Sequence, residues 1–163
     1  MLFRSTIKTP IGLLYLIADQ QILLASGFSS FKDLTKRLSS EDAVRESRLV
    51  PEIPILSELI NNYFIGDISA LNSIQVRQPG ATFYQSVWKA MRKVPAGKTW
   101  SYAELAKRSG SADAVRATGS ACASNLVALI IPCHRIIKSG GSLGNYAYGA
   151  EVKKWLLRHE GAL

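Results

Sequence analysis

A thiol and an imidazole stand side by side in the second half of the chain, at Cys133 and His134. A cysteine acts as a nucleophile only in its thiolate form, which a basic or cationic neighbour favours. Arg135 follows directly and adds a guanidinium to the same stretch. A lone buried cysteine is more often a small apolar residue than a reactive group. The pair therefore fits a structural role as well as a catalytic one, and the rest of the sequence has to decide.

Six apolar residues, 126–131, precede this group and predict a buried strand rather than a helix. Pro132 cannot donate a ladder hydrogen bond, so regular pairing is expected to stop there. Adjacent residues of a strand point to opposite faces. Cys133 and His134 can therefore serve one site only if the backbone leaves strand geometry at the proline.

The net charge of +8 lies entirely in the second half of the chain. Residues 1–80 carry eight Lys or Arg and eight Asp or Glu, whereas residues 81–163 carry twelve and four. This asymmetry predicts a polyanionic partner, nucleic acid first, with a solvated basic face as the alternative.

Composition excludes several other classes of protein. No run of about 18 apolar residues occurs, so no transmembrane helix is expected. The first residues lack the basic start and apolar core of a signal peptide, and a cytoplasmic location is expected. Two cysteines are too few for a disulfide framework. No Cys-x-x-Cys or His-x-x-x-His pair occurs, so no metal site is expected.

Hydrophobic periodicity predicts strands followed by helices in the first half. The strands are expected at 3–7, 13–17 and 22–25, with a hairpin turn at 19–21. Helices are expected at 29–38 and 54–64, a polar loop at 39–47 and an irregular stretch at 68–80. Pro79 and Gly80 then form a linker, which divides the chain into domains 1–80 and 81–163.

The second half is mainly helical, with helices predicted at 82–93, 101–109 and 112–123. Ser101 and Glu104 fit a capping box at the start of the middle helix. The last two helices, joined by a tight turn, resemble a helix-turn-helix. Nine of the thirteen residues 112–124 are Ala, Gly, Ser or Cys. Such a helix suits the DNA minor groove with Arg116 as a probe, or else the protein core with Arg116 in a surface ion pair.

Three motifs resemble those of the O6-alkylguanine-DNA alkyltransferases, also called methylated-DNA–protein-cysteine methyltransferases. They are Ile-Pro-Cys-His-Arg-Ile at 131–136 with Asn125 upstream, Arg-Ala-Thr-Gly at 116–119, and Gly-Asn-Tyr at 144–146. The similarity runs from about residue 82 to residue 161 and is looser over the first eighty residues. It implies an α/β (α+β) protein, with a ribonuclease-H-like N-terminal α/β domain and a mainly helical, winged-helix or helix-turn-helix-like C-terminal domain.

The resemblance also implies a reaction. Cys133 would accept an alkyl group from O6-alkylguanine in double-stranded DNA, with O4-alkylthymine as a second candidate substrate. His134 would remove the thiol proton through a water, and Glu160 would orient His134. The product is a thioether, which water does not hydrolyse readily, so each molecule is expected to act once. No cofactor is implied, and a monomer is expected.

The other implied site residues follow from the same resemblance. Asn125 is implied as the hinge before the active-site segment, and Tyr102 as a hydrogen-bond donor to the guanine ring. Arg116 is implied to fill the space left when the damaged base is flipped out of the duplex. The further implied DNA contacts are Tyr102, Ala117, Gly119, Ser120 and Arg135. The implied base pocket is lined by Ile136, Tyr146, Tyr148 and Lys153.

Leu126, Ala128 and Tyr148 depart from the family's common pattern. Tyr148 stands where glycine is common, and its ring would narrow the pocket or act as a lid. We therefore expect bulky adducts such as benzyl to react more slowly than methyl. Cys122 is expected to be structural because no basic neighbour in the sequence would activate it. His159 is expected at the surface, at a helix end.

Two other functional classes stay open on the residues alone. A helix-turn-helix regulator would explain the charge and the helices but leave Cys133, His134 and Glu160 unused. A cysteine hydrolase would use Cys133 and His134 but leave Arg116 and the small-residue helix unexplained.

Overall fold

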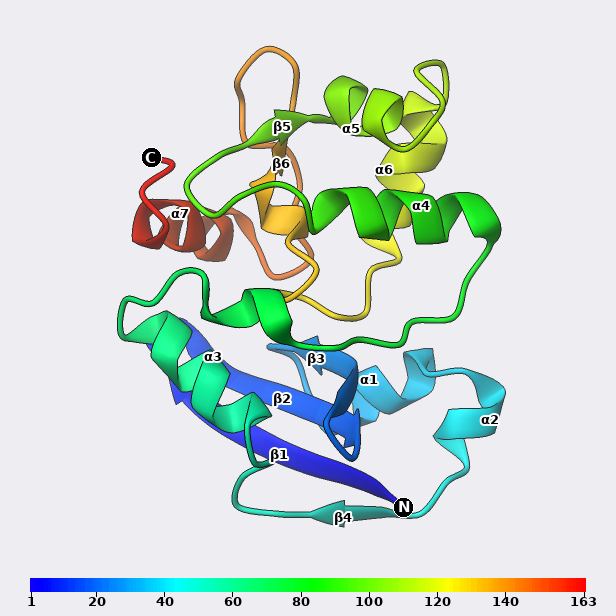
Figure 1. The fold of residues 1–163 in the computed structure, drawn as a ribbon, viewed down its shortest axis with the longest axis vertical. Coiled ribbons are helices and arrows are strands. Elements are labelled where there is room, and N and C mark those ends of the chain that lie inside the picture. The colour runs from blue at the N-terminus through cyan, green and yellow to red at the C-terminus, as the bar shows by residue number, and fades with distance from the viewer. The chain divides into compact units, whose positions relative to one another are not determined.

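Four strands form the sheet at the N-terminal end of the chain in the computed structural model, which describes residues 1–163 (Figure 1). The strand order is β3-β2-β1-β4, with β1 antiparallel to β2, β2 antiparallel to β3, and β4 parallel to β1. Their bounds are β1 Leu2–Thr9, β2 Gly12–Asp19, β3 Ile22–Gly27 and β4 Ser47–Leu49. The three predicted strands and the hairpin turn between the second and third are confirmed, while β4 was not predicted.

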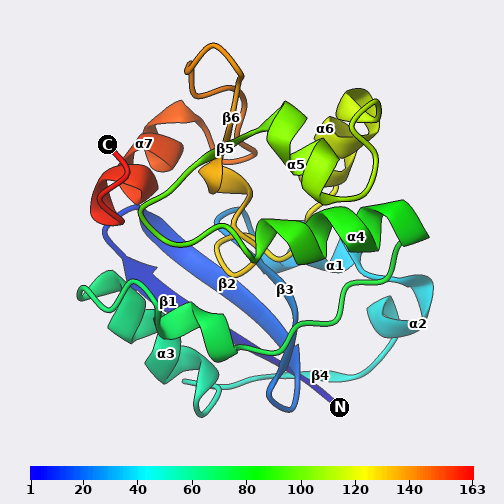
Figure 2. The same ribbon diagram turned by 45° about the horizontal axis from the view of Figure 1, so that its top comes forward.

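Short helices pack against this sheet, with α3 in front of the strands and α1 behind them in Figures 1 and 2. Leu34 of α1 is fully buried in a cluster with Leu2, Ile17 and Leu24 from the strands. The predicted loop at 39–47 is wrong in part, because Ser39 caps a one-turn helix there through Asp42 N. The helices are α1 Phe31–Arg37, α2 Ser40–Ala43, α3 Leu56–Phe64 and the 3₁₀ helix η1 Ala70–Ser73.

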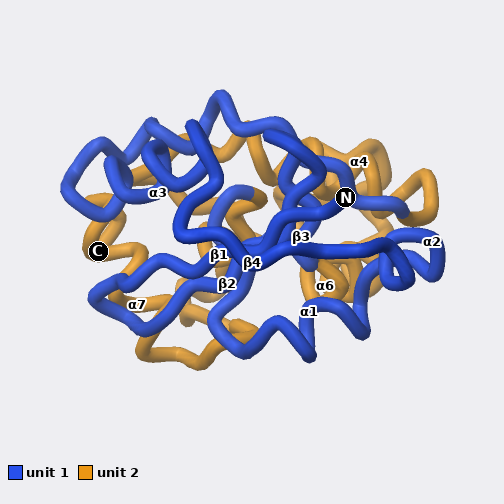
Figure 3. Tube along the Cα trace, turned by 90° about the horizontal axis from the view of Figure 1, so that it is seen from below, with its two compact units in different colours: residues 1–79, 126–130 blue, residues 80–125, 131–163 orange.

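The chain divides into two compact units, coloured separately in Figure 3. The first holds Met1–Pro79 together with Leu126–Ile130, and the second holds Gly80–Asn125 with Ile131–Leu163. The units therefore differ from the predicted domains 1–80 and 81–163, because a five-residue segment of the second half belongs to the first unit.

The segment Leu126–Ile130 is not the strand that its apolar run predicted. It forms turns, with a single bridge between Val127 and Ser26 of β3. Leu129 has a φ of 78°, which a β-strand cannot accommodate. All five residues are buried. The apolar run therefore predicted the burial of this segment correctly and its backbone conformation wrongly. A buried turn and a buried strand can have the same composition.

The second unit is mainly helical, as predicted. Ser101 begins α5 by accepting a hydrogen bond from Glu104 N at 3.0 Å, whereas the Glu104 carboxylate accepts from Arg108 Nε. One half of the predicted capping box is thus present. The unpredicted strands β5 and β6 pair in parallel. The elements are α4 Thr82–Met91, β5 Trp100–Ser101, α5 Tyr102–Arg108, α6 Val115–Ala123, the 3₁₀ helix η2 Cys133–Arg135, β6 Ile136–Ile137 and α7 Ala150–His159.

Indole and backbone contacts hold α6 against its neighbours. Trp88 of α4 donates from Nε1 to the Ala121 carbonyl at 2.8 Å. Thr118 and Ala121 of α6 are completely buried. This leaves the opposite side of α6 to face outward.

No helix of the chain has the length and apolarity needed to cross a membrane.

Candidate active site

Pro132 ends the buried segment and turns the chain into a single 3₁₀ turn, Cys133–Arg135. This turn removes the strand geometry that would have sent Cys133 and His134 to opposite faces. Cys133 stays partly exposed, while His134 and Arg135 are buried. A partly exposed cysteine is thus followed directly by two buried basic residues.

His134 is fixed in one orientation by Glu160. Its Nε2 lies 2.9 Å from Glu160 Oε2, and both side chains are buried. A carboxylate only accepts hydrogen bonds, so Nε2 carries the proton and Nδ1 is left with its lone pair. Burial lowers the pKa of His134, which outweighs the opposing effect of Glu160. Nδ1 is buried and no protein group donates to it, so its lone pair can accept a proton.

Arg135 holds Glu160 from the other side. Its Nε and Nη2 donate to the two carboxylate oxygens at 2.9 and 3.0 Å, and its Nη1 donates to the Val94 carbonyl at 2.8 Å. Burial by itself would raise the pKa of Glu160. The hydrogen bonds from His134 and Arg135, with the Arg135 charge, outweigh burial and hold that pKa well below its usual range. Glu160 is therefore ionised at neutral pH.

The placement of Arg135 corrects a sequence prediction. Arg135 was expected to contact DNA, but its guanidinium is inside the second unit and all its groups point at Glu160 and Val94. Sequence reasoning missed the turn that supports this pair. Gly97 has a φ of 90°, and a Cβ there would lie 3.0 Å from the Glu160 carbonyl oxygen. The Pro-Ala-Gly run at 95–97 was the available signal.

Asn125 connects the two sides of the active-site segment. Its Nδ2 donates to the Ile131 carbonyl at 2.9 Å and lies 3.5 Å from Cys133 Sγ. An N–H group directed at sulfur favours the thiolate over the thiol, because it stabilises the negative charge. The residue predicted as a hinge thus also contacts the predicted nucleophile.

Lys153 ties the loop beyond β6 to the site. Its ammonium donates to the carbonyls of Ile136, Leu143 and Asn145 at 2.6, 2.5 and 3.3 Å. The side chain is fully buried, and burial lowers the pKa of Lys153, an effect that Cys133 opposes. Lys153 therefore fixes the loop backbone, and its contact with a base stays a prediction.

Three aromatic rings lie edge to face along this loop. The His134 and Tyr146 ring centroids are 6.4 Å apart, and those of Tyr146 and Tyr148 are 5.8 Å apart. Gly144 lies against the Tyr102 ring, whose Cε2 would be 3.5 Å from an added Cβ. Burial raises the pKa of Tyr102, and Cys122 and Cys133 raise it further. The Tyr102 hydroxyl is therefore protonated at neutral pH and can donate.

One face of α6 is open to solvent. Arg116, Ser120 and Ala123 are exposed, and nothing lies within 4 Å of a Cβ added at Gly119. Residues 116, 119, 120 and 123 share one side of a helix. The alternative of a helix packed in the core with a paired arginine holds only in part: the inner side of α6 is buried, but Arg116 forms no ion pair. Ala117, also predicted to contact DNA, is partly exposed.

Cys122 lies on the inner side of α6. Its Sγ is 3.8 Å from Met91 Sδ, and burial raises the pKa of the thiol to about 12. The sulfur is therefore a thiol at neutral pH and a poor nucleophile. This agrees with the structural role that the sequence predicted. His159 is partly exposed and stacks on Trp155, with ring centroids 4.7 Å apart.

Comparisons with known proteins agree with this arrangement. Residues 82–162 match the family model described as 6-O-methylguanine DNA methyltransferase, DNA binding domain. The chain is 34% identical to a methylated-DNA–protein-cysteine methyltransferase of Salmonella typhimurium, over 99% of this chain and 97% of the relative. It is 33% identical to one from Methanosarcina acetivorans, over 99% of both.

Solved structures show the same similarity. The O6-methylguanine methyltransferase of Mycobacterium tuberculosis superposes with a TM-score of 0.79 at 30% identity, covering 99% of this chain and 94% of that one. A second structure of the M. tuberculosis protein, in complex with DNA, gives a TM-score of 0.80 at 30% identity, covering 98% and 93%.

Proposed function

The chain belongs to the methylated-DNA–protein-cysteine methyltransferases, and from this we propose that it repairs DNA by transferring the alkyl group of O6-alkylguanine directly to Cys133. The observation that carries the proposal is the chain of hydrogen bonds that begins at His134, the residue after Cys133. Arg135 holds Glu160, Glu160 holds the proton of His134 Nε2, and Nδ1 is left as a base. Asn125 Nδ2 is directed at the same sulfur.

The reaction balances with these groups alone. The thiol proton of Cys133 passes through a water to His134 Nδ1, and the thiolate attacks the alkyl carbon. The carbon–O6 bond breaks, and its electron pair stays on the guanine. Tyr102 donates its hydroxyl proton to a ring nitrogen of the guanine as this charge develops. The proton that His134 took from the thiol then replaces it on Tyr102, so both side chains end in their starting protonation states. The products are an S-alkylcysteine and an unmodified guanine.

Substrate access requires the base to leave the duplex, because its O6-alkyl group is not reachable in the stack. We assign the open face of α6 to the DNA minor groove, where its small residues allow close approach. Arg116, exposed and without an ion pair, then fills the space of the extruded base. Ala117, Gly119 and Ser120 contact the DNA from the same helix.

Each molecule acts once under this proposal. A thioether is stable to water, so regeneration of Cys133 would need a second nucleophile. The other thiol, Cys122, has its pKa raised to about 12 by burial and is protonated at neutral pH. The protein is thus consumed by its own reaction.

The proposal extends to the fold and the setting. We assign the first unit to a ribonuclease-H-like domain and the second to a winged-helix or helix-turn-helix-like domain, with β5 and β6 beside α5 and α6. The base pocket is formed by the loop with Tyr146 and Tyr148, together with Ile136 and Lys153. O4-alkylthymine as a further substrate, a monomeric state and a cytoplasmic location stay predictions.

Incubation with a duplex labelled on the O6-methyl group tests the reaction class. The proposal predicts label on the protein, and none on Cys133→Ala. DNA binding without transfer would instead indicate a regulator that only binds DNA. Repeated turnover of an acyl ester would indicate a cysteine hydrolase. Either of these results would contradict the proposal.

A further inference from the structure

The segment Leu126–Ile130 stands between two residues that build the active site. Asn125 precedes it and Ile131 follows it, and the Asn125 amide donates to the Ile131 carbonyl at 2.9 Å. The same amide nitrogen lies 3.5 Å from Cys133 Sγ. The segment is therefore an excursion of the chain that begins and ends at the active site. The Asn125 amide joins the residues on its two sides and contacts the Cys133 sulfur.

Two residues of the first unit hold the excursion. Ser26 donates from Oγ to the Ala128 carbonyl at 2.6 Å, donates from its backbone N to the Leu126 carbonyl at 3.0 Å and accepts from Ala128 N at 3.1 Å. Gln78 accepts from Leu126 N through Oε1 at 2.5 Å. The backbone groups of Leu126 and Ala128 are thus all satisfied by Ser26 and Gln78.

These contacts hold a conformation that the segment would not adopt by itself. Its backbone makes no ladder beyond one bridge, so its buried polar groups depend on the partners just named. Leu129 sits at a φ of 78°, a strained region for a residue with a branched side chain. Ser26 is completely buried, and its hydroxyl is the direct partner of the Ala128 carbonyl. Loss of the hydroxyl would leave the Ala128 carbonyl buried and unsatisfied.

We propose that Ser26 and Gln78 are positioning residues for alkyl transfer, which fix the segment so that Asn125, Ile131 and Cys133 keep their geometry. This inference rests on the proposed function. The first unit then has a role in the reaction besides stability, although it carries none of the reacting groups. Small misplacements of a nucleophile cost large factors in rate, even when their origin is remote.

Ser26→Ala and a matched control test the proposal. Ser5 is also completely buried in a strand of the first unit, and its Oγ donates to the Pro51 carbonyl at 3.1 Å. Ser5→Ala therefore removes the same type of bond from the same unit, away from the excursion. Gln78→Leu removes the acceptor of Leu126 N, and Gln78→Glu restores an oxygen there. If Ser26→Ala does not fold, Gln78→Leu and Gln78→Glu test the same positioning role.

Three measurements are compared in all variants: the midpoint of urea unfolding, the single-turnover rate with saturating O6-methylguanine duplex, and the rate–pH profile of Cys133 with iodoacetamide in the absence of DNA. Ser26→Ala and Gln78→Leu are expected to slow transfer by about tenfold or more and to move the iodoacetamide profile to higher pH. Ser5→Ala is expected to lower the urea midpoint while keeping both rates, and Gln78→Glu to keep the wild-type transfer rate.

Wild-type rates and profiles in both Ser26→Ala and Gln78→Leu would overturn the inference. Equal losses of rate in Ser5→Ala and Ser26→Ala would also overturn it, because they would reduce the effect to general stability. A wild-type protein that transfers no methyl group would overturn the proposed function, and this inference with it.

Discussion

His134 owes its role to the difference between its two ring nitrogens. One donates to a carboxylate that Arg135 keeps ionised, and the other has no partner in a buried setting. A protonated ring would place an additional charge where water cannot solvate it, so the free base is the stable form. The base is therefore available over the whole neutral range.

This burial makes stability depend on pH in a defined direction. The folded pKa of His134 lies below the unfolded value of about 6.5. Below that pH the unfolded chain binds a proton that the folded chain does not, so the free energy of unfolding falls on acidification by at most about 1.4 kcal/mol per pH unit. The stability from this group is complete above about pH 6.5 and decreases as the pH approaches the folded pKa.

Replacement of the ring tests the assignment. His134→Gln is expected to show a smaller loss of stability than the wild type between about pH 7 and pH 5 in urea unfolding. His159 and the carboxylates are present in both proteins, so the difference isolates His134. Parallel pH dependences in the two proteins would show that the ring is not buried in its neutral form.

Tyr148 is expected to limit the size of the adduct that reacts. Its ring lies edge to face on Tyr146, with centroids 5.8 Å apart and planes at 72°. Tyr148→Gly is expected to raise the rate on O6-benzylguanine relative to O6-methylguanine by about tenfold or more, the range over which a pocket discriminates by size. A loss of stability would lower both rates equally, so the ratio of the two rates is not affected by it. Equal rates on both substrates in the wild type would refute this role.

Under the proposed function, α6 contacts the DNA and takes no part in the alkyl transfer itself. Its inner side packs through Trp88 and Thr118, and its outer side carries Arg116. Since Arg116 touches none of the reacting groups, its proposed contribution is limited to opening the duplex. A substrate that needs no flipping should not depend on it.

Arg116→Ala is therefore expected to slow transfer from duplex DNA by about tenfold or more, because flipping costs a few kcal/mol, and to keep the rate with free O6-benzylguanine base. Arg158→Ala removes an exposed positive charge from α7 of the same unit and serves as the matched control for charge. Equal losses on duplex and free base would place Arg116 in the chemistry. Equal losses in both variants on duplex DNA would reduce its role to charge.

The elements differ in how well the sequence predicts them. Periodic apolar residues located β1–β3, α1, α3 and α4, because each of these buries one face along a regular repeat. The capping serine Ser101 located the start of α5, and no range was predicted for α7. The pair β5–β6 has only two residues in each strand, too few to show a repeat. The strand predicted for the segment 126–130 was wrong. The polar backbone groups of this segment are satisfied by Ser26 and Gln78, which are far away in the sequence.

The active site shows the same division. Cys133, His134 and Asn125 were predicted as site residues from their spacing and from the resemblance, because few chemical roles are open to these residue types. The burial of Arg135 could not be predicted, because an arginine near a basic surface and an arginine paired with a distant Glu160 look alike in one dimension. The contact of Asn125 with the sulfur likewise depends on the closed excursion between residues 125 and 131.

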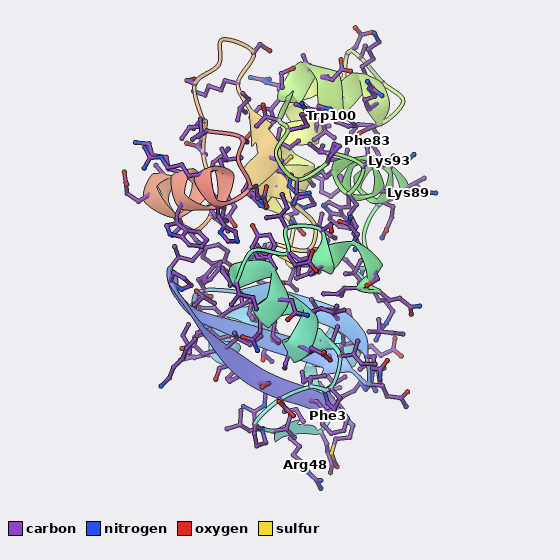
Figure 4. The ribbon with its side chains drawn as sticks, turned by 60° about the vertical axis from the view of Figure 1, so that its left-hand side comes forward. Phe3, Arg48, Phe83, Lys89, Lys93 and Trp100 are labelled. Carbon is purple, nitrogen blue, oxygen red and sulfur yellow. The ribbon has the colours of Figure 1, made fainter.

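For the whole molecule, charge and reactive groups are concentrated in the second unit. Among its twelve Lys and Arg residues only Arg135 and Lys153 are buried. The exposed Lys89 of α4 and Lys93, two residues beyond the end of that helix, are labelled in Figure 4. Such a surface provides sequence-independent affinity for phosphates. The first unit has no net charge and none of the reacting groups, so its contribution is confined to folding and to the segment that it holds.

The central claim is that Cys133 itself keeps the alkyl group, once per molecule. The most direct test is to incubate the protein with excess O6-methylguanine duplex, digest it and map the added mass on its peptides. The expected result is a plateau at one methyl group per protein, located on Cys133, with no further repair of the remaining DNA. A methyl group on another residue, or repair that continues beyond one equivalent, would contradict it.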